Sequence, residues 1–173
     1  MGDWHKALPA KKSLNMKNLC IVPCGKRKIW DEKPKKHDQR PVDLGPVEAK
    51  CAYTGPFSTK CREYAEKFYP GEWCILSAKY GFVLPEEMIS GPYNVSFNDK
   101  KTCPITIDEL ILQVRQKKLD DIENVVVLGG KRYASIAEKA FPGKSVSNPL
   151  ANCRGLGYMM QKINHAIRNG NTL

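Results

Sequence analysis

The segment from residue 75 to 97, ILSAKYGFVLPEEMISGPYNVSF, gathers side chains suited to holding a small ligand. Its first two residues read as the end of a buried strand, and the remainder shows neither a helical nor a strand period. Hydroxyl, amino, phenol and amide groups follow on Ser77, Lys79, Tyr80, Tyr93 and Asn94. The two phenol rings suit stacking on a base or closure over a sugar ring. The hydroxyl and amide groups suit reading its hydrogen-bonding atoms.

Two adjacent carboxylates in this segment, Glu86 and Glu87, suggest acid–base chemistry. An N-glycosidic bond breaks through a cation-like sugar, which a carboxylate beneath the ring stabilises while it orients water. We therefore predict Glu87, or its neighbour Glu86, as a catalytic group in hydrolysis or exchange of such a bond. The alternative is a loop whose tyrosines fill a small core of its own and whose glutamates lie on the surface.

Two further loops repeat a glycine-and-base pattern, CGKRK at 24–28 and GGKRY at 129–133. Exposed backbone N–H groups beside cations suit a phosphate. The candidate phosphate-binding residues are Gly25, Lys26, Arg27, Lys28, Gly129, Gly130, Arg132 and Tyr133. Neither loop has the spacing of a P-loop or of a dinucleotide fingerprint. The alternative is two basic turns exposed to solvent.

The seven cysteines and three histidines of the chain predict neither a metal site nor a cofactor. They include no Cys-x-x-Cys pair, and the histidines lie outside any ligand spacing. Cys20 and Cys74 lie in apolar runs and are expected to be buried. Cys24 lies beside three cations, which lower the pKa of a thiol. A thiol redox sensor that uses Cys24 is therefore a weaker alternative function.

Alternating apolar runs and amphipathic segments indicate the fold class. Buried strands are expected within 18–25, 72–78 and 124–130, with a weaker fourth at 144–150. Helices are expected over 47–69 with a break at Gly55-Pro56, 106–119 with a capping box from Thr106 to Glu109, 133–140 and 156–168. Long connections between strands predict a three-layer α/β/α sandwich with a mostly parallel sheet of about four core strands.

The predicted fold brings the polar loops together. In an open α/β sheet, ligands bind beyond the carboxyl ends of the strands. The loops after the first three predicted strands are the three segments described above. We therefore expect one site at that end of a single domain spanning 18–173, preceded by a flexible basic arm over 1–17.

The charge of the chain favours an anionic partner. Its formal net charge is +10, and residues 1–40 hold eleven Lys and Arg against four Asp and Glu. Such an imbalance suits nucleic acid or nucleotide phosphates, although a solvated basic tail would look the same. No apolar run is long enough to span a membrane, and no secretory signal is visible. We expect a cytoplasmic protein with reduced thiols.

The motifs also carry a resemblance. LSAKYGFVLPEEMISGPYNVSF is similar to a segment of the YaaA-like peroxide-stress proteins. The chain looks closer still to a sister group of small uncharacterised proteins, in CGKRK, AYTGPF, GPY, VVVLGGKRY and NPLANCRGLGYMMQKI. The YaaA-like proteins are associated with DNA binding and protection from oxidative damage. This chain is shorter, has Asn94 rather than a base after Tyr93, and lacks a separate helix-hairpin-helix insertion.

These observations predict a nucleic-acid- or nucleotide-binding protein that hydrolyses or exchanges an N-glycosidic bond. The alternative from another class is a non-catalytic DNA-binding stress-response module that works through its basic face alone. The sequence leaves open the base, the polymer, the oligomeric state and whether the protein is an enzyme.

Overall fold

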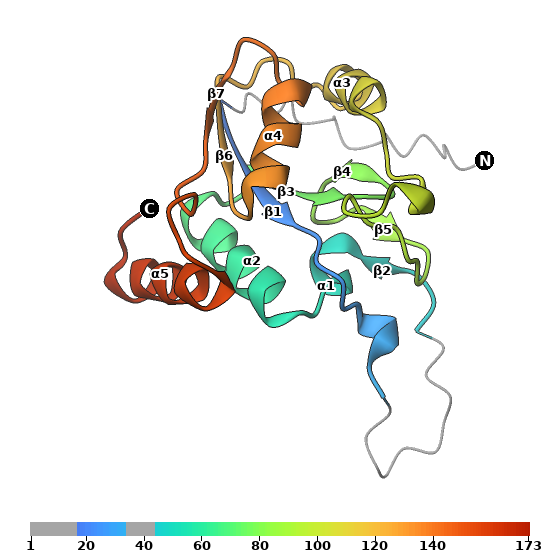
Figure 1. Cartoon of the computed structure of the whole chain (residues 1–173), viewed down its shortest axis with the longest axis horizontal. Helices are drawn as coiled ribbons and strands as arrows, with labels where there is room; N and C mark the ends of the chain where they lie inside the picture. Colours follow the sequence, from blue (N-terminus) through green and yellow to red (C-terminus); the bar gives the residue numbers. More distant parts are fainter. Residues whose placement is uncertain (1–16, 34–43) are drawn as a thin grey trace, which may run out of the picture.

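The computed structural model describes residues 17–33 and 44–173, and its centre is a five-stranded sheet (Figure 1). The strands are β1 (Asn18–Pro23), β3 (Trp73–Ser77), β4 (Gly81–Val83), β6 (Asn124–Val127) and β7 (Ser145–Ser147). Their order in the sheet is β4-β3-β1-β6-β7, and all neighbouring pairs are parallel except β3 with β4. The predicted mixed α/β fold with about four parallel strands is confirmed, including the weakly signalled strand β7.

Five α-helices lie in the described part of the chain. They are α1 (Ala49–Ala52), α2 (Pro56–Phe68), α3 (Ile107–Gln116), α4 (Lys131–Ala140) and α5 (Leu156–Asn169). Short 3-10 turns occupy Ile29–Asp31 and Lys100–Thr102. The helices α2 and α5 pack side by side, and α3 packs against α4 (Figure 1).

Two apolar cores form because successive side chains of a strand point to opposite faces of the sheet. From β1, Cys20 and Val22 pack with residues of α1, α2 and α5. From the same strand, Leu19 and Ile21 pack with residues of α3 and α4. The near-continuous apolar run of β1 is therefore the consequence of a strand covered on both sides.

Local signals in the sequence fix several helix ends. The side chain of Thr106 accepts from the backbone N–H of Glu109, and the Glu109 carboxylate accepts from the backbone N–H of Thr106. This is the predicted capping box, and it begins α3. The predicted break at Gly55-Pro56 is also confirmed, since proline occupies the first position of α2, where its missing N–H costs nothing.

The segment after β3 corrects an expectation. Sequence periodicity predicts no regular structure between 77 and 94, yet β4 pairs antiparallel with β3, and β5 (Met88–Ile89) pairs with β2 (Val47–Glu48). Strands of two or three residues are too short to display a period. The turn into β4 depends on Gly81, whose φ of +75° lies in the left-handed region that favours glycine.

The side chain of Gln113 on α3 holds this β3–β4 turn. Its amide donates to the carbonyl of Tyr80 over 2.8 Å and accepts from the N–H of Phe82 over 2.9 Å. A Cβ at Gly81 would collide with the same amide. The turn is therefore fixed from both its backbone and the helix that covers it.

Among the described helices, none is both long and apolar enough to cross a membrane. The predicted basic arm over 1–17 lies outside the described residues, apart from Lys17.

Candidate functional site

Polar and aromatic side chains converge where the parallel strands end, a region we call the carboxyl end of the sheet. They come from the last residue of β3, from the loop after β1, from the residue after α1, from the start of α4 after β6, and from the segment after β5. The cluster consists of Ser77, Cys24, Lys28, Tyr53, Tyr133 and Tyr93. Five segments distant in sequence thus build one site, as an open α/β sheet allows.

Three hydroxyl groups form a hydrogen-bonded chain at the centre of this cluster. The phenol oxygen of Tyr93 lies 2.6 Å from that of Tyr53 and 2.7 Å from the Ser77 hydroxyl. Ser77 and Tyr53 are 0% and 4% exposed. Burial raises the pKa of Tyr53 to about 12 and that of Tyr93 further. Both phenols therefore keep their protons at neutral pH.

When donors and acceptors are matched in this chain, one phenol proton has no acceptor. The Ser77 oxygen accepts from the backbone N–H groups of Lys79 and Tyr80, which occupies both of its lone pairs. Ser77 must therefore donate its own proton to Tyr93. Whichever phenol donates in the Tyr53–Tyr93 bond, the other has a proton with no acceptor among the described residues.

A buried cation lies beside this chain. Lys28 is only 5% exposed, and its ammonium lies 4.4 Å from the centre of the Tyr93 ring and donates to the carbonyl of Lys26 over 3.0 Å. No carboxylate within the described ranges forms an ion pair with it. A buried charge costs free energy unless it is paired, and a carbonyl and a ring face compensate an ammonium only in part.

A second cation and ring extend the cluster toward solvent. Lys79 is exposed, and its ammonium lies 5.0 Å from the Tyr80 ring centre and 5.4 Å from that of Tyr93. The two rings meet edge to face at 5.3 Å. Tyr80 remains partly exposed, so the aromatic surface continues from the buried chain to the rim of the site.

Cys24 and Tyr133 form the side of the cluster nearest α4. The Cys24 sulfur lies 3.3 Å from the Tyr133 hydroxyl, and burial is the main cause that raises the pKa of that phenol. Ser58 of α2 donates to the Cys24 carbonyl. A Cβ at the next residue, Gly25, would collide with the Ser58 hydroxyl, and its φ is +67°. The predicted tight turn at Gly25 is thus present and requires glycine.

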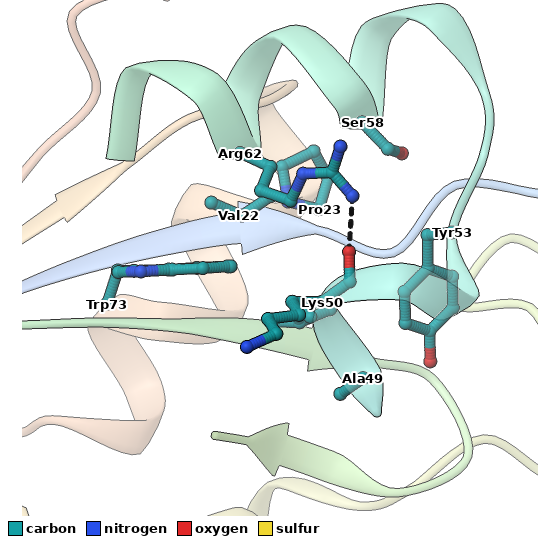
Figure 2. Close-up of a pocket in the computed structure, with 9 residues that line it drawn as sticks. Val22, Pro23, Ala49, Lys50, Tyr53, Ser58, Arg62 and Trp73 are labelled. Atoms are coloured by element: carbon teal, nitrogen blue, oxygen red, sulfur yellow. Dashed lines mark hydrogen bonds between the residues drawn. The ribbon is translucent and has the colours of Figure 1, made fainter. Parts of the chain in front are cut away.

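Tyr53 directly follows α1, whose contact with α2 is drawn in Figure 2. Figure 2 shows Arg62 reaching from α2 to donate to the carbonyl of Lys50 in α1. A cavity of about 10 Å³, roughly one water in size, lies between these elements beside Tyr53. Next to it in sequence, the buried hydroxyl of Thr54 has no hydrogen-bond partner among the described residues.

The structure does not bring the two predicted catalytic carboxylates to this cluster. Since β4 runs antiparallel to β3, the turn that follows it returns toward the amino-terminal half of β3. There Glu87 accepts from the N–H of Leu84 over 2.6 Å and pairs over 2.7 Å with Lys117, the residue that follows α3. Glu86 is exposed and lies near Lys50. The catalytic role of either residue stays a prediction.

The remaining predicted residues lie around the cluster rather than in it. Lys26 and Asn94 are exposed, and Arg27 lies 3.8 Å from Glu32. Arg132 donates to the carbonyl of Phe97. Gly129 and Gly130 form the turn that starts α4, with Gly130 as its N-cap. The second Gly-Lys-Arg loop therefore contributes Tyr133 to the cluster, while its arginine holds a neighbouring loop.

Sequence reasoning missed Tyr53, Thr54 and Gln113. The first two lie in AYTGPF, just before the break at Gly55-Pro56. A polar pair immediately before a helix break is a signal for a loop residue with a role of its own. Gln113 carries no such signal, because a glutamine in an amphipathic helix is ordinary.

Two comparisons with known proteins match this chain. A model described as a family of unknown function, DUF6884, matches residues 35–165. The uncharacterised protein YfjM of Bacillus subtilis (strain 168) is 43% identical over 159 residues, which cover 91% of this chain and 100% of that protein. No solved structure matches significantly. Neither match bears on the YaaA-like proteins, so that resemblance stays a prediction. A family model that covers well over half of the chain places it plainly: the chain belongs to the DUF6884 family.

Proposed function

We propose that this protein binds a nucleotide or a nucleic acid at the carboxyl end of its sheet. One observation carries the proposal: the ammonium of Lys28 is buried without a carboxylate among the described residues. An anionic oxygen of a ligand would supply the missing partner and recover the cost of burying the charge. A phosphate is the anion that nucleotides and nucleic acids share.

The neighbouring groups match the same ligand. The phenol proton left over in the chain of Ser77, Tyr93 and Tyr53 donates to a second oxygen of the phosphate. The ring of Tyr80, with the ammonium of Lys79 beside it, suits a base or a sugar at the rim. The proposed frame for this site is the three-layer α/β/α sandwich, which the two apolar cores support.

Isothermal titration with nucleoside monophosphates at low ionic strength tests the proposal. We expect binding that weakens about tenfold or more in Lys28→Met, since a charged hydrogen bond contributes about 1.5–3 kcal/mol. Lys139→Met is the matched control, because it removes an equal charge from an exposed position on α4. Nucleosides without phosphate should bind far more weakly than the monophosphates.

Two results would overturn the proposal. One is the absence of binding for every nucleotide and for short oligonucleotides. The other is a Lys28→Met variant that folds and binds as tightly as the parent protein, since the buried ammonium would then have no part in the site.

A further inference from the structure

A groove beside α5 is lined by basic and amide side chains. Its volume is about 640 Å³, and its polar lining includes Asn152, Arg154, Gln161, Lys162 and His165. No carboxylate lines it. The groove is an open surface depression rather than an enclosed cavity, so a ligand longer than the groove can lie across it.

The charged side chains in the sequence around this groove are all basic. After Glu138, the last 35 residues contain five Lys and Arg and no Asp or Glu. Arg154 has neither a hydrogen bond nor an ion pair among the described residues, and the ammonium of Lys162 donates only to the carbonyl of Pro149. The positive charge of the groove is therefore not compensated within the described parts of the chain.

An aromatic ring stands exposed in the same groove. Tyr158, in the first turn of α5, is 62% exposed, and its neighbour Leu156 is 55% exposed. Tyr158 contacts no other aromatic ring in the described residues. An exposed ring among unpaired cations is the combination that binds single strands, because every base offers a face for stacking.

We infer that this groove binds a single-stranded nucleic acid. Its phosphates contact Arg154 and Lys162, and an unpaired base stacks on Tyr158. A duplex keeps its bases stacked on one another, so it can use the two cations but not the ring. The ligand class follows from charge complementarity and from the ring, independently of the buried lysine.

The position of the groove extends this inference to the whole protein. Residues 148–155 leave β7 at the carboxyl end of the sheet and lead into α5. If the site around Lys28 is also occupied, a polymer can contact both, whereas a mononucleotide can fill only one of them. This second step rests on the proposed function.

Fluorescence anisotropy with a labelled deoxythymidine 20-mer and a labelled 20-base-pair duplex tests the groove. We expect the single strand to bind more tightly, and Tyr158→Ala to weaken it by about five- to a hundredfold, as loss of one base stack does. Tyr158→Trp should restore the affinity. Arg154→Ala and Lys162→Ala should each lower the salt slope by about 0.7. Lys139→Ala, an exposed cation on α4, is the matched control.

The outcomes separate the two proposals. Equal affinity for duplex and single strand, or unchanged single-strand binding in Tyr158→Ala, overturns the groove inference. Loss of oligonucleotide binding in Tyr158→Ala with unchanged binding in Lys28→Met supports the groove and contradicts the proposed function. The reverse case is nucleotide binding that depends on Lys28 together with a 20-mer that binds no more tightly than a mononucleotide. That result supports the proposed function and contradicts the groove inference. Circular dichroism and thermal melting confirm that each variant folds.

Discussion

Three neighbouring basic residues have different environments in this protein. Lys26 and Arg27 are exposed, whereas Lys28 is buried against the ring of Tyr93. The 3-10 turn that follows explains the difference, since the Asp31 carboxylate accepts from the Lys28 backbone N–H and fixes the local chain. Substitutions in this triplet therefore have distinct consequences, and the sharpest tests concern the groups that Lys28 faces.

The two phenols of the hydroxyl chain should differ in their effect on stability. Tyr93→Phe removes the central group and leaves the hydroxyls of Ser77 and Tyr53 without their partner. We expect a loss of about 1–3 kcal/mol in the free energy of unfolding. Tyr53→Phe removes only the end of the chain and should cost less, about 1 kcal/mol. Urea denaturation measures both, and equal losses would contradict the central place of Tyr93 in the chain of hydroxyl groups.

Stability should fall at alkaline pH because of the buried phenols. Burial raises the pKa of Tyr53 from its ordinary value of 10.0 to about 12. The folded state therefore keeps this proton while the unfolded state loses it. The stabilisation that this proton gives the folded state is fully present below pH 10 and is lost as the pH rises through 12. Its size is roughly 1.4 kcal/mol for each unit by which the folded pKa exceeds the unfolded one. Thermal melts between pH 9 and 12 should decline less steeply in Tyr53→Phe, and an identical decline would refute this assignment.

Among the elements, α3 controls the loop that carries Lys79 and Tyr80. Its Gln113 side chain hydrogen-bonds to both sides of the β3–β4 turn, and Lys117, just after the helix, pairs with Glu87 beyond β4. Helix α3 thus positions part of the candidate site without contributing a residue to it. Residues of α3 should act on ligand affinity through the turn.

Gln113→Ala is the direct test of this positioning role. It leaves the carbonyl of Tyr80 and the N–H of Phe82 without a partner, so we expect a loss of about 1–3 kcal/mol in unfolding free energy. Nucleotide affinity should fall as well, because the Tyr80 ring loses its fixed position. Gln116→Ala, which removes an exposed glutamine from the same helix, should change neither quantity. Unaltered binding in Gln113→Ala would show that the turn holds without α3.

Because Glu87 forms an ion pair with Lys117, its substitution should affect stability rather than ligand binding. Glu87→Gln keeps an acceptor for Leu84 but loses the ion pair with Lys117, which is partly exposed. We expect a cost of about 0.2–1 kcal/mol and no change in ligand affinity. An assay for free base released from nucleotides, DNA and RNA, with Glu86→Gln beside it, tests the catalytic role. Base release that disappears only in Glu87→Gln would restore the catalytic prediction.

The elements differ in how far the sequence predicts them. Periodicity and end signals predict β1, β3, β6, α2 and α3, because long apolar patterns and capping residues act locally. The β3–β4 pairing escapes prediction, since three residues show no period and the pairing depends on Gln113 from α3.

The candidate site divides in the same way. The end of β3 predicts Ser77, and the glycine turn predicts Lys28. The separation of Glu87 from Tyr93 follows only from the reversal of the chain through β4. A linear sequence does not contain that reversal as a local signal, so the prediction placed Glu87 and Tyr93 in the same part of the site.

At the scale of the whole molecule, positive charge lies at both ends of the sequence. Residues 1–40 and the segment after Glu138 are both basic. The described part of the first segment, residues 17–33, contains Lys28. The second segment lines the groove beside α5. The middle of the chain holds most of the acidic residues, so positive charge is concentrated in these two segments, which attract polyanions.

Salt dependence should distinguish the cations beside the candidate site from cations elsewhere on the surface. In a single-strand binding assay, Lys26→Ala with Arg27→Ala should make the slope of log affinity against log salt about 1.4 less steep. Each lost phosphate contact accounts for about 0.7 of that change. Titrations between 50 and 300 mM KCl would measure it. Lys117→Ala with Lys118→Ala, both just after α3, removes equal charge away from the site. An equal loss of slope in both double variants would mean that only net charge matters.

The two lateral borders of the sheet, β4 and β7, are each three residues long. A strand from another chain adds to a sheet by pairing with a long open border, and neither border offers more than a single short ladder. Recruitment of a partner by strand addition is therefore disfavoured, as is edge-to-edge growth into fibrils. The protein should remain dispersed at high concentration through geometry as well as charge, and its contacts with other macromolecules should use side chains rather than backbone.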